Sequence, residues 1–370
     1  MKSVESIAVI DNNLKKRKNY TAVSLFTGAG GMDIGFEKAG IIPKVAVELM
    51  KEAANTYSIN HPKTKVINDD INNVIRTFDK YKGVDFVFGG PPCQGFSVAG
   101  KMDPDDERSK LVFTFLDAVE KIQPKVFVME NVKALGTLSK WSDVRKKYFE
   151  QAKNMGYNCV SFVLKATDYG VPQKRERVFF IGIKGNDDEL FESNFQELLK
   201  KQQIKAPSVR EVLKDLGKAG SERNPNTCTS KITFATRPVM RKSPYSGMYF
   251  NGQGRPIDVD NYSNTLPASM GGNKTPFVDE EYLYGDSKED WVVGYHKGLM
   301  EGKITPSFEE APTRLRRITI NEAARIQTFP NGYKFFGSKG KIYTQIGNAV
   351  PSRLAEAVAK TVVSYLEKFL

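Results

Sequence analysis

The sequence is poor in cysteine and histidine, and this scarcity excludes two kinds of structural cross-link. Its 370 residues include three cysteines and two histidines. The cysteines (Cys93, Cys159, Cys228) are scattered, so they form no disulfide framework. Two histidines without a Cys-x-x-Cys pair are too few for a structural zinc site, and we expect no metal site.

The sequence also lacks long apolar runs. No apolar stretch approaches the roughly 20 residues that span a membrane. The apolar patch Ile7–Ile10 precedes the basic run Lys15–Lys18, which is the reverse of the order in a secretory signal peptide. We therefore expect a cytoplasmic protein with no membrane partner. Mean hydropathy is −0.42 and 40% of the residues are hydrophobic, which is typical of one large or two medium globular domains.

Acidic residues are outnumbered by basic ones. The net charge is +12 and the isoelectric point is near 9.3. Such an excess favours a polyanionic partner such as nucleic acid, although a lysine-rich composition without any partner would give the same balance. Residues 1–20 form a polar arm that ends in a basic cluster. We expect a solvated tail there, and contact with phosphates is the alternative.

Two regions differ in their periodicity. From Thr21 to about residue 185, short β-branched runs alternate with amphipathic stretches, which predicts a parallel sheet covered by helices on both faces. Residues 186–341 are rich in Pro, Gly, Asn and Ser and predict a loop-rich second domain, and residues 342–370 predict a closing helix that returns to the first domain. The predicted strands are 22–26, 44–49, 65–67, 84–88, 125–131, 159–166 and 177–183, with helices at 31–40, 51–59 and 111–122.

Chemically active residues follow five successive predicted strands, and ligands of open α/β sheets bind at the carboxyl ends of strands. Glu48 lies about 20 residues beyond a glycine loop, where an acid can accept hydrogen bonds from a ribose diol. A nucleoside-bearing cofactor is therefore expected. Asp70 could accept from an adenine amino group or cap a helix, and the sequence favours neither. The five strand-end segments are Thr27–Gly31, Glu48, Asp69–Asp70, Gly89–Cys93 and Glu130–Asn131.

Cys93 stands in the segment GGPPCQGFS (Gly89–Ser97), directly after a predicted strand. Two prolines and two glycines define the backbone of this turn, which suits the presentation of a nucleophilic thiolate better than a packed core thiol. Glu130 lies at the end of the run FVMEN, and we expect its carboxylate to point into the same crevice as Cys93. A salt-bridged acid at a strand end is the alternative interpretation. No histidine lies near Cys93 in the sequence, which argues against a cysteine protease.

Segments in order along most of the chain resemble the DNA (cytosine-5) methyltransferases of bacterial type II restriction-modification systems. The cysteine segment, the ENV segment and the QKRER segment together are highly specific, whereas residues 184–313 match mainly by position, as the target-recognition region. The matching segments are Ser24–Gly40, Val47–Leu49, Asp69–Ile71, Gly89–Lys101, Asp105–Leu111, Met129–Val132, Gly170–Gly182, Arg316–Pro330 and Gln345–Pro351.

The resemblance implies a Rossmann-like, S-adenosylmethionine-dependent methyltransferase sheet with a smaller target-recognition domain. It also implies that Cys93 adds to carbon 6 of a flipped-out cytosine, that Glu130 binds the ring nitrogen and amino group, and that Arg177, with Arg175 in support, binds the ring carbonyl. For both arginines a surface or phosphate contact is the alternative, held about equal for Arg175. The implied cofactor contacts are Phe26, Gly28, Gly30, Glu48, Asp70, Ile71, Gly90, Leu111 and Asn348, and the implied substrate contacts are Gln94, Ser97, Thr265 and Leu266.

The sequence therefore predicts a sequence-specific methyltransferase of double-stranded DNA, monomeric and associated with the nucleoid through its DNA. A cognate restriction endonuclease acting on the same site without a stable complex is a further expectation. The transfer-RNA branch of the family is one alternative, but its Cys-Phe-Thr signature is absent, because Thr229 and Ser230 follow Cys228. A non-catalytic paralogue is the other, and the intact Cys93, Glu130 and Arg177 argue against it.

Overall fold

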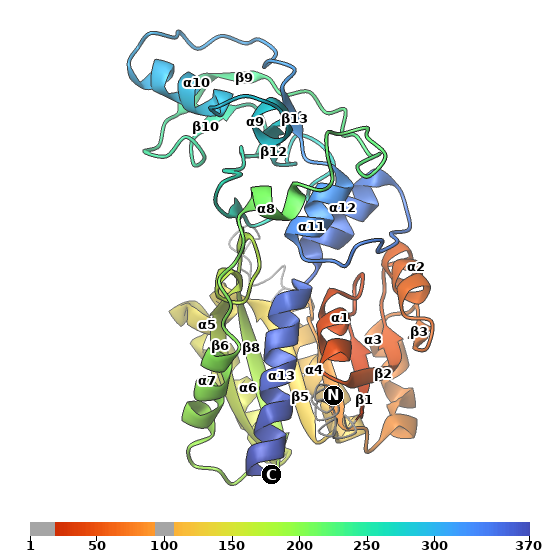
Figure 1. Ribbon diagram of the computed structural model, residues 1–370. Helices are drawn as coiled ribbons and strands as arrows, with labels where there is room; N and C mark the ends of the chain where they lie inside the picture. Colours follow the sequence, from red (N-terminus) through yellow and green to blue (C-terminus); the bar gives the residue numbers. More distant parts are fainter. Residues whose placement is uncertain (1–18, 93–106) are drawn as a thin grey trace, which may run out of the picture.

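The computed structural model describes residues 19–92 and 107–370, and a seven-stranded sheet forms its larger part (Figure 1). The strands lie in the order β3-β2-β1-β4-β5-β8-β6. The order reverses between β1 and β4, and such a switch point is where α/β sheets bind ligands. The strand bounds are β1 (Tyr20–Leu25), β2 (Ile41–Val47), β3 (Lys65–Ile67), β4 (Phe86–Gly89), β5 (Val126–Val132), β6 (Tyr157–Lys165) and β8 (Glu176–Lys184).

The predicted all-parallel arrangement is wrong at one strand. The first five strands of the chain pair in parallel, but β8 runs antiparallel to both β5 and β6. The connection from β6 to β8 explains the reversal. It contains only the short helix η3 (Ala166–Asp168) and the two-residue strand β7 (Gln173–Lys174), and a parallel return would need a longer crossover.

Helices cover both faces of the sheet, as expected for an α/β fold. Successive side chains of a strand point to opposite faces, so Phe127 and Phe180 pack on one side while Val126 and Phe179 pack on the other. Helices α1 (Gly31–Lys38), α7 (Phe191–Lys201) and α13 (Ser352–Phe369) cover the face of Val126 and Phe179, with α13 beside α1 and α7 (Figure 1). The other face is covered by α4 (Glu107–Ile122), α6 (Ser142–Asn154) and η1 (Ile75–Tyr81).

Shorter elements complete the larger part of the molecule. They are α2 (Lys51–Asn60), α3 (Ile71–Val74), α5 (Lys133–Thr137) and η2 (Ser139–Trp141). Among the described residues, no helix has the length and apolar character needed to cross a membrane.

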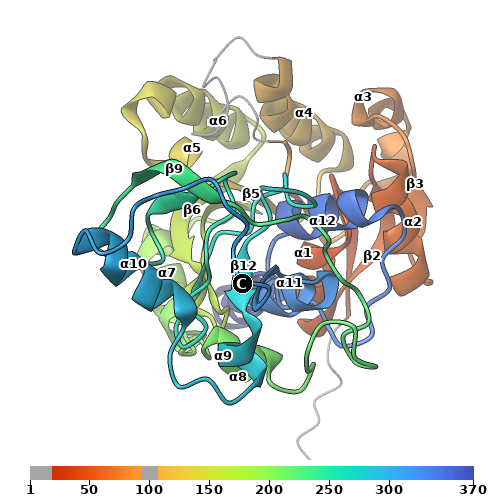
Figure 2. The same ribbon diagram turned by 90° about the horizontal axis from the view of Figure 1, so that it is seen from above.

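A smaller part, built mainly of loops, lies beyond one end of the sheet (Figure 1), and Figure 2 shows it from above. Two apolar clusters hold it together, and one of them includes Ala29 and Ile34 from the glycine loop and α1. The smaller part is therefore packed directly on the end of the sheet where β1 leads into the glycine loop. Its elements are α8 (Val209–Leu213), β9 (Phe234–Val239), β10 (Met248–Phe250), β11 (Ser263–Asn264), β12 (Phe277–Asp279), α9 (Glu280–Tyr284), α10 (Trp291–Met300), β13 (Leu315–Arg317), α11 (Ile320–Ile326) and α12 (Lys339–Asn348).

Candidate active site

Glu48 braces the glycine loop that follows β1. Its Oε2 accepts a hydrogen bond from the backbone N–H of Gly28 at 2.7 Å, and its Oε1 accepts from the N–H of Met50 at 2.8 Å. Burial raises the pKa of the Glu48 carboxyl, and the backbone donors oppose that shift. Phe26 adopts a left-handed φ of 53°, which is costly for an aromatic residue and is the kind of strain that gathers at functional sites.

Beneath the loop lies a buried cluster of titratable side chains. His61 Nδ1 lies 2.8 Å from Glu37 Oε1, and its Nε2 lies 3.1 Å from the Tyr333 hydroxyl. Gly30 has a φ of 82°, and a Cβ at this position would lie 2.6 Å from His61 Nε2 and 2.9 Å from the Tyr333 hydroxyl. The residue must therefore be glycine for steric as well as conformational reasons.

The other predicted cofactor residues are placed at or near the same end of the sheet. Asp70 caps α3, because its Oδ1 accepts a hydrogen bond from Asn72 N at 2.8 Å. This is the contact that the helix-capping interpretation of Asp70 predicts. Ile71 is buried in the core, Leu111 is half-buried on α4, and Asn348 is exposed at the end of α12.

Leu49 was not predicted as a site residue. Its side chain is 68% exposed directly beside Glu48, and Asn68 Nδ2 donates to the backbone carbonyls of both residues, at 2.8 Å for Glu48 and 2.9 Å for Leu49. An exposed leucine held next to a buried acid offers an apolar surface to a ring system. The sequence signal was available, since Leu49 directly follows the strand-end acid.

Glu130 and Arg177 form the centre of the candidate active site. Arg177 Nε lies 2.8 Å from Glu130 Oε1, from neighbouring antiparallel strands β5 and β8. Burial raises the pKa of Glu130, and the charges of Arg177 and Arg175 oppose the rise. No described residue gives Oε1 a well-aligned hydrogen bond, so this oxygen keeps capacity for another donor. Gly90 leaves room for the acid, because a Cβ there would lie 2.9 Å from Glu130 Oε2.

Arg175 is buried rather than exposed to solvent or phosphate. Its side chain is part of a residue only 2% exposed, and its guanidinium donates to the carbonyls of Gly347 at 3.1 Å and Asn348 at 3.5 Å. The arginine therefore ties the start of β8 to the end of α12. Arg175 thus faces the end of α12, while Arg177 faces Glu130.

The predicted Thr265–Leu266 pair lies against the segment that carries the arginines. Strand β11 pairs with β7, the Thr265 hydroxyl donates to the Lys174 carbonyl at 2.8 Å, and Leu266 N donates to Gln173 Oε1 at 3.1 Å. Thr265 is exposed and Leu266 is buried. A pair from the smaller part is thus docked within a few residues of Arg177.

Cys93, Gln94 and Ser97 lie outside the described residues. The described chain reaches Pro92, and the carbonyl of Pro91 accepts a hydrogen bond from Asn131 Nδ2 at 3.2 Å. This bond holds Pro91, two residues before Cys93, next to Asn131, which directly follows Glu130. Of the two cysteines in the described part, Cys159 has a thiol pKa raised by burial, which makes it a poor nucleophile.

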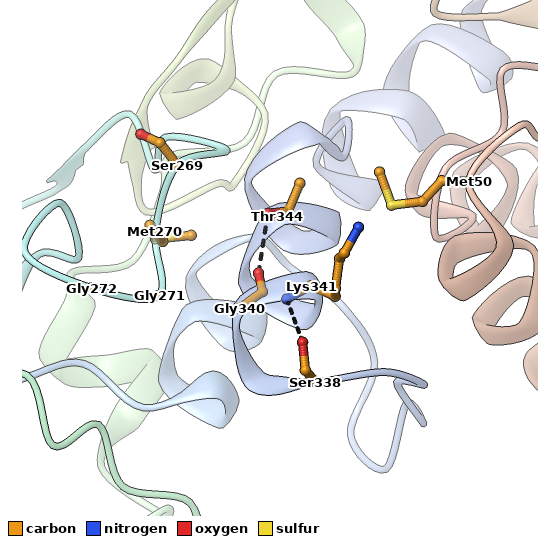
Figure 3. Close-up of a pocket in the computed structure, with 9 residues that line it drawn as sticks. All are labelled: Met50, Ser269, Met270, Gly271, Gly272, Ser338, Gly340, Lys341 and Thr344. Carbon is orange, nitrogen blue, oxygen red and sulfur yellow. Dashed lines mark hydrogen bonds between the residues drawn. The ribbon is translucent and has the colours of Figure 1, made fainter.

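An open pocket of about 510 Å³ lies between the loop after β2, the loop of residues 269–272 and α12 (Figure 3). Figure 3 shows Met50 on one side, Ser269 and Met270 on the other, and Lys341 and Thr344 of α12 between them. No predicted site residue lines this pocket. Met50 lines the pocket, and its backbone N–H donates to Glu48, the acid that also binds Gly28 of the glycine loop. The pocket therefore lies next to this loop, but Glu130 and Arg177 do not line it.

Comparisons with known sequences agree with this arrangement. The family model described as C-5 cytosine-specific DNA methylase matches residues 20–364. The type II methyltransferase M.Sau96I of Staphylococcus aureus is 32% identical, over 97% of this chain and 79% of its own length. M.DdeI of Desulfomicrobium norvegicum is 33% identical, over 93% of this chain and 89% of its own length.

Solved structures share the fold. A protein described as a DNA modification methyltransferase encoded within an E. coli prophage superposes with a TM-score of 0.65 at 24% identity, covering 95% of this chain and all of its own. The Dnmt2 methyltransferase of S. pombe superposes with a TM-score of 0.63 at 17% identity, covering 94% of this chain and 99% of its own. These likenesses bear on the fold alone.

Proposed function

Since this chain belongs to the C-5 cytosine-specific DNA methylase family and is a DNA (cytosine-5) methyltransferase, we propose that it acts through a covalent adduct between Cys93 and a cytosine flipped out of double-stranded DNA. The observation that carries this proposal is the buried Glu130–Arg177 pair. It lies against Gly90, three residues before Cys93 in the chain. A carboxyl and a guanidinium this close together suit the binding of one pyrimidine edge, which supports the proposal.

S-adenosylmethionine supplies, when bound, an electrophilic methyl group. The residues at the ends of β1 and β2 fit such a nucleoside-bearing cofactor. Each oxygen of Glu48 accepts one backbone N–H, which leaves a lone pair on each for ribose hydroxyls. Within the described part of the chain, no other residue's atom lies within 4 Å of where a Cβ of Gly28 would stand, apart from the adjacent residues, so the loop is open there, and Leu49 offers an exposed apolar face. We assign the remaining contacts to Phe26, Gly30, Asp70, Ile71, Gly90, Leu111 and Asn348.

The protein side chains would then make carbon 5 of cytosine reactive. Carbon 5 is too electron-poor to be methylated directly, so the Cys93 thiolate adds to carbon 6 and converts the ring to an enamine. Glu130 hydrogen-bonds the ring nitrogen and the amino group, and Arg177 binds the ring carbonyl, so both stabilise the charge that develops as sulfur adds. After carbon 5 has been methylated, loss of its proton and expulsion of the thiolate restore the aromatic ring.

The base must leave the helix before Cys93 can reach carbon 6, at a cost of a few kcal/mol. The net charge of +12 suits the phosphate contacts that hold the duplex during this step. We propose that residues 186–341 read the DNA sequence, that residues 21–185 and 342–370 carry the reaction, and that Gln94, Ser97, Thr265 and Leu266 contact the substrate. We place a monomer on the DNA of a bacterial cytoplasm, with a restriction endonuclease acting independently on the same site.

The test is methylation sequencing of DNA from a host that lacks cytosine methylation and expresses the wild-type chain, Cys93→Ala or Cys228→Ala. A short motif methylated by the wild type and by Cys228→Ala, but not by Cys93→Ala, is expected. Methylation by purified Cys93→Ala would overturn the mechanism. If folded wild-type protein binds S-adenosylmethionine but leaves the DNA unmethylated, transfer RNA becomes the substrate to assay.

A further inference from the structure

Two fully buried glutamines connect segments that lie far apart in the sequence. Gln173 in β7 and Gln327 at the end of α11 are both 0% exposed, and Gln173 Nε2 donates to Gln327 Oε1 at 2.6 Å. On one side, Leu266 N donates to Gln173 Oε1 at 3.1 Å. On the other side, Gln327 Nε2 donates to the carbonyl of Ala349. The hydrogen bonds run in one direction from Leu266 to Ala349, through both amides.

The Leu266 end of this chain of hydrogen bonds belongs to the smaller part. Leu266 and the adjacent Thr265 dock on β7, and Ser263 N donates to the Pro172 carbonyl at 3.0 Å. Only Lys174, Arg175 and Glu176 separate Gln173 from Arg177 in the chain. A displacement of Gln173 would therefore move both the docked pair and the strand that begins beside Arg177.

The Ala349 end belongs to the cofactor side of the sheet. Ala349 caps α12 directly after Asn348, and the carbonyls of Gly347 and Asn348 accept from Arg175. Gly31 packs so closely here that a Cβ would lie 2.5 Å from the Val350 carbonyl. The glycine loop, the end of α12 and β7 are thus joined at one place.

The residue after Gln327 shows how tightly this junction is held. Thr328 has a left-handed φ of 66°, an unfavourable conformation for a β-branched residue. Its hydroxyl accepts from Arg353 N at 3.2 Å, and its carbonyl accepts from the Ser352 hydroxyl. These bonds join the end of α11 to the start of α13 and keep Gln327 facing Gln173.

We propose that Gln173 and Gln327 are positioning residues that hold the docked Thr265–Leu266 pair in register with Glu130 and Arg177 during base flipping and methyl transfer. The proposal rests on the function proposed above, because it concerns the geometry of that reaction. An amide pair suits this role since each group both donates and accepts, and buried amide bonds are directional. Apolar side chains could fill the same volume, but they would leave Leu266 N and the Ala349 carbonyl unpaired and free to shift.

The test compares Gln173→Met, Gln327→Met and the double variant with the wild-type enzyme on a DNA duplex that the wild type is first shown to methylate. The matched control is Gln345→Met. Gln345 is also a buried glutamine, 2% exposed, and donates to the Phe336 carbonyl at 2.9 Å, but none of its recorded hydrogen bonds reaches the two positioning glutamines. Single-turnover methylation rate, KM for DNA, cofactor affinity and melting temperature are measured for each.

Each positioning variant is expected to lower the single-turnover rate about 10- to 100-fold, the effect of misplacing reacting groups by about 1 Å. Cofactor affinity should stay within about threefold of wild type, and Gln345→Met should lose melting temperature without a comparable loss of rate. The double variant should be no slower than the slower single variant, because either single substitution already breaks the same chain of hydrogen bonds.

Two results would overturn the positioning role. One is a rate loss in Gln345→Met equal to that in Gln173→Met at the same loss of melting temperature. The other is a double variant whose rate loss is the product of the two single losses. An inactive wild-type enzyme would instead count against the proposed function, so the two failures can be told apart.

Discussion

Arg177 Nε lies 2.8 Å from Glu130 Oε1, and the two side chains are only 16% and 10% exposed. They come from neighbouring strands, β5 and β8, and β8 is the strand that runs against its neighbours. This reversal brings the beginning of β8 to the carboxyl end of β5. The Arg177 guanidinium therefore lies next to the Glu130 carboxyl at this edge of the sheet. Gly90, three residues before Cys93, lies beside the same carboxyl.

Removing Arg177 should destabilise the fold through the charge that it leaves behind. Arg177→Ala would leave Glu130 buried, with Arg175 as the remaining cation acting on it. This should lower the free energy of unfolding by about 3 kcal/mol. Urea denaturation at neutral pH measures this cost. The control is Lys133→Ala, which breaks the more exposed Lys133–Glu176 ion pair and should cost at most about 1 kcal/mol. Equal losses in the two variants would show that Glu130 does not depend on Arg177.

Replacing Glu130 with glutamine should separate catalysis from folding. Glu130→Gln keeps the size of the side chain but removes the charge, so single-turnover methylation should fall about 100-fold or more. The loss of stability should be smaller than in Arg177→Ala, because the amide oxygen can still accept a hydrogen bond from Arg177. Glu176→Gln, on a half-buried acid of the adjoining strand that pairs with Lys133 instead, is the control and should keep the wild-type rate. A wild-type rate in Glu130→Gln would remove this acid from the mechanism.

A methyl group at Gly90 should act on the same carboxyl. The added Cβ of Gly90→Ala would stand 2.9 Å from Glu130 Oε2 and displace it, so we expect a rate loss of about 10-fold or more. Gly294→Ala is the matched control, because no atom lies within 4 Å of its Cβ position and it is inside α10. That control should be neutral or slightly stabilising. Full activity in Gly90→Ala would mean that Glu130 can move without consequence.

Asp33 of α1, which is fully buried and interacts electrostatically with His61, should make stability depend on pH. Burial raises the pKa of Asp33 to about 6, so between about pH 4 and pH 6 the folded protein holds a proton that the unfolded chain releases. Stability should therefore fall as pH rises through this window, by about 3 kcal/mol. Burial lowers the pKa of His61, but Glu37 and Asp33 together more than offset this and raise it, which adds a loss of the same sign at higher pH.

Asp33→Asn should remove the part of this slope that lies between about pH 4 and pH 6. Tyr57 donates to Asp33 Oδ1 at 2.9 Å, and an asparagine oxygen can accept the same bond, so the variant should still fold. Urea unfolding of both proteins at several pH values makes the comparison. An unchanged slope in the variant would assign the pH dependence to another group.

The local pattern of the sequence was enough to predict most of the sheet and its strand-end residues. Alternating and helical periodicity located β1 to β6 and β8 within a few residues, and the rule that parallel strands end at one edge brought Glu48 and Glu130 to that edge. The same pattern was present in residues 191–201, where apolar residues at helical spacing form α7, but the surrounding loop-rich composition concealed it.

Tertiary structure alone decided how the two parts of the molecule meet. Arg175 is buried against the carbonyl of Gly347, 172 residues further along the chain, and Gln173 meets Gln327 across 154 residues. Such contacts leave no periodic signal, since a polar residue in a short extended segment looks the same whether it faces solvent or another buried amide. The sequence by itself determined which residues stand at the strand ends. The fold decided which of them are paired, because hydrogen-bond partners are chosen by proximity in space rather than along the chain.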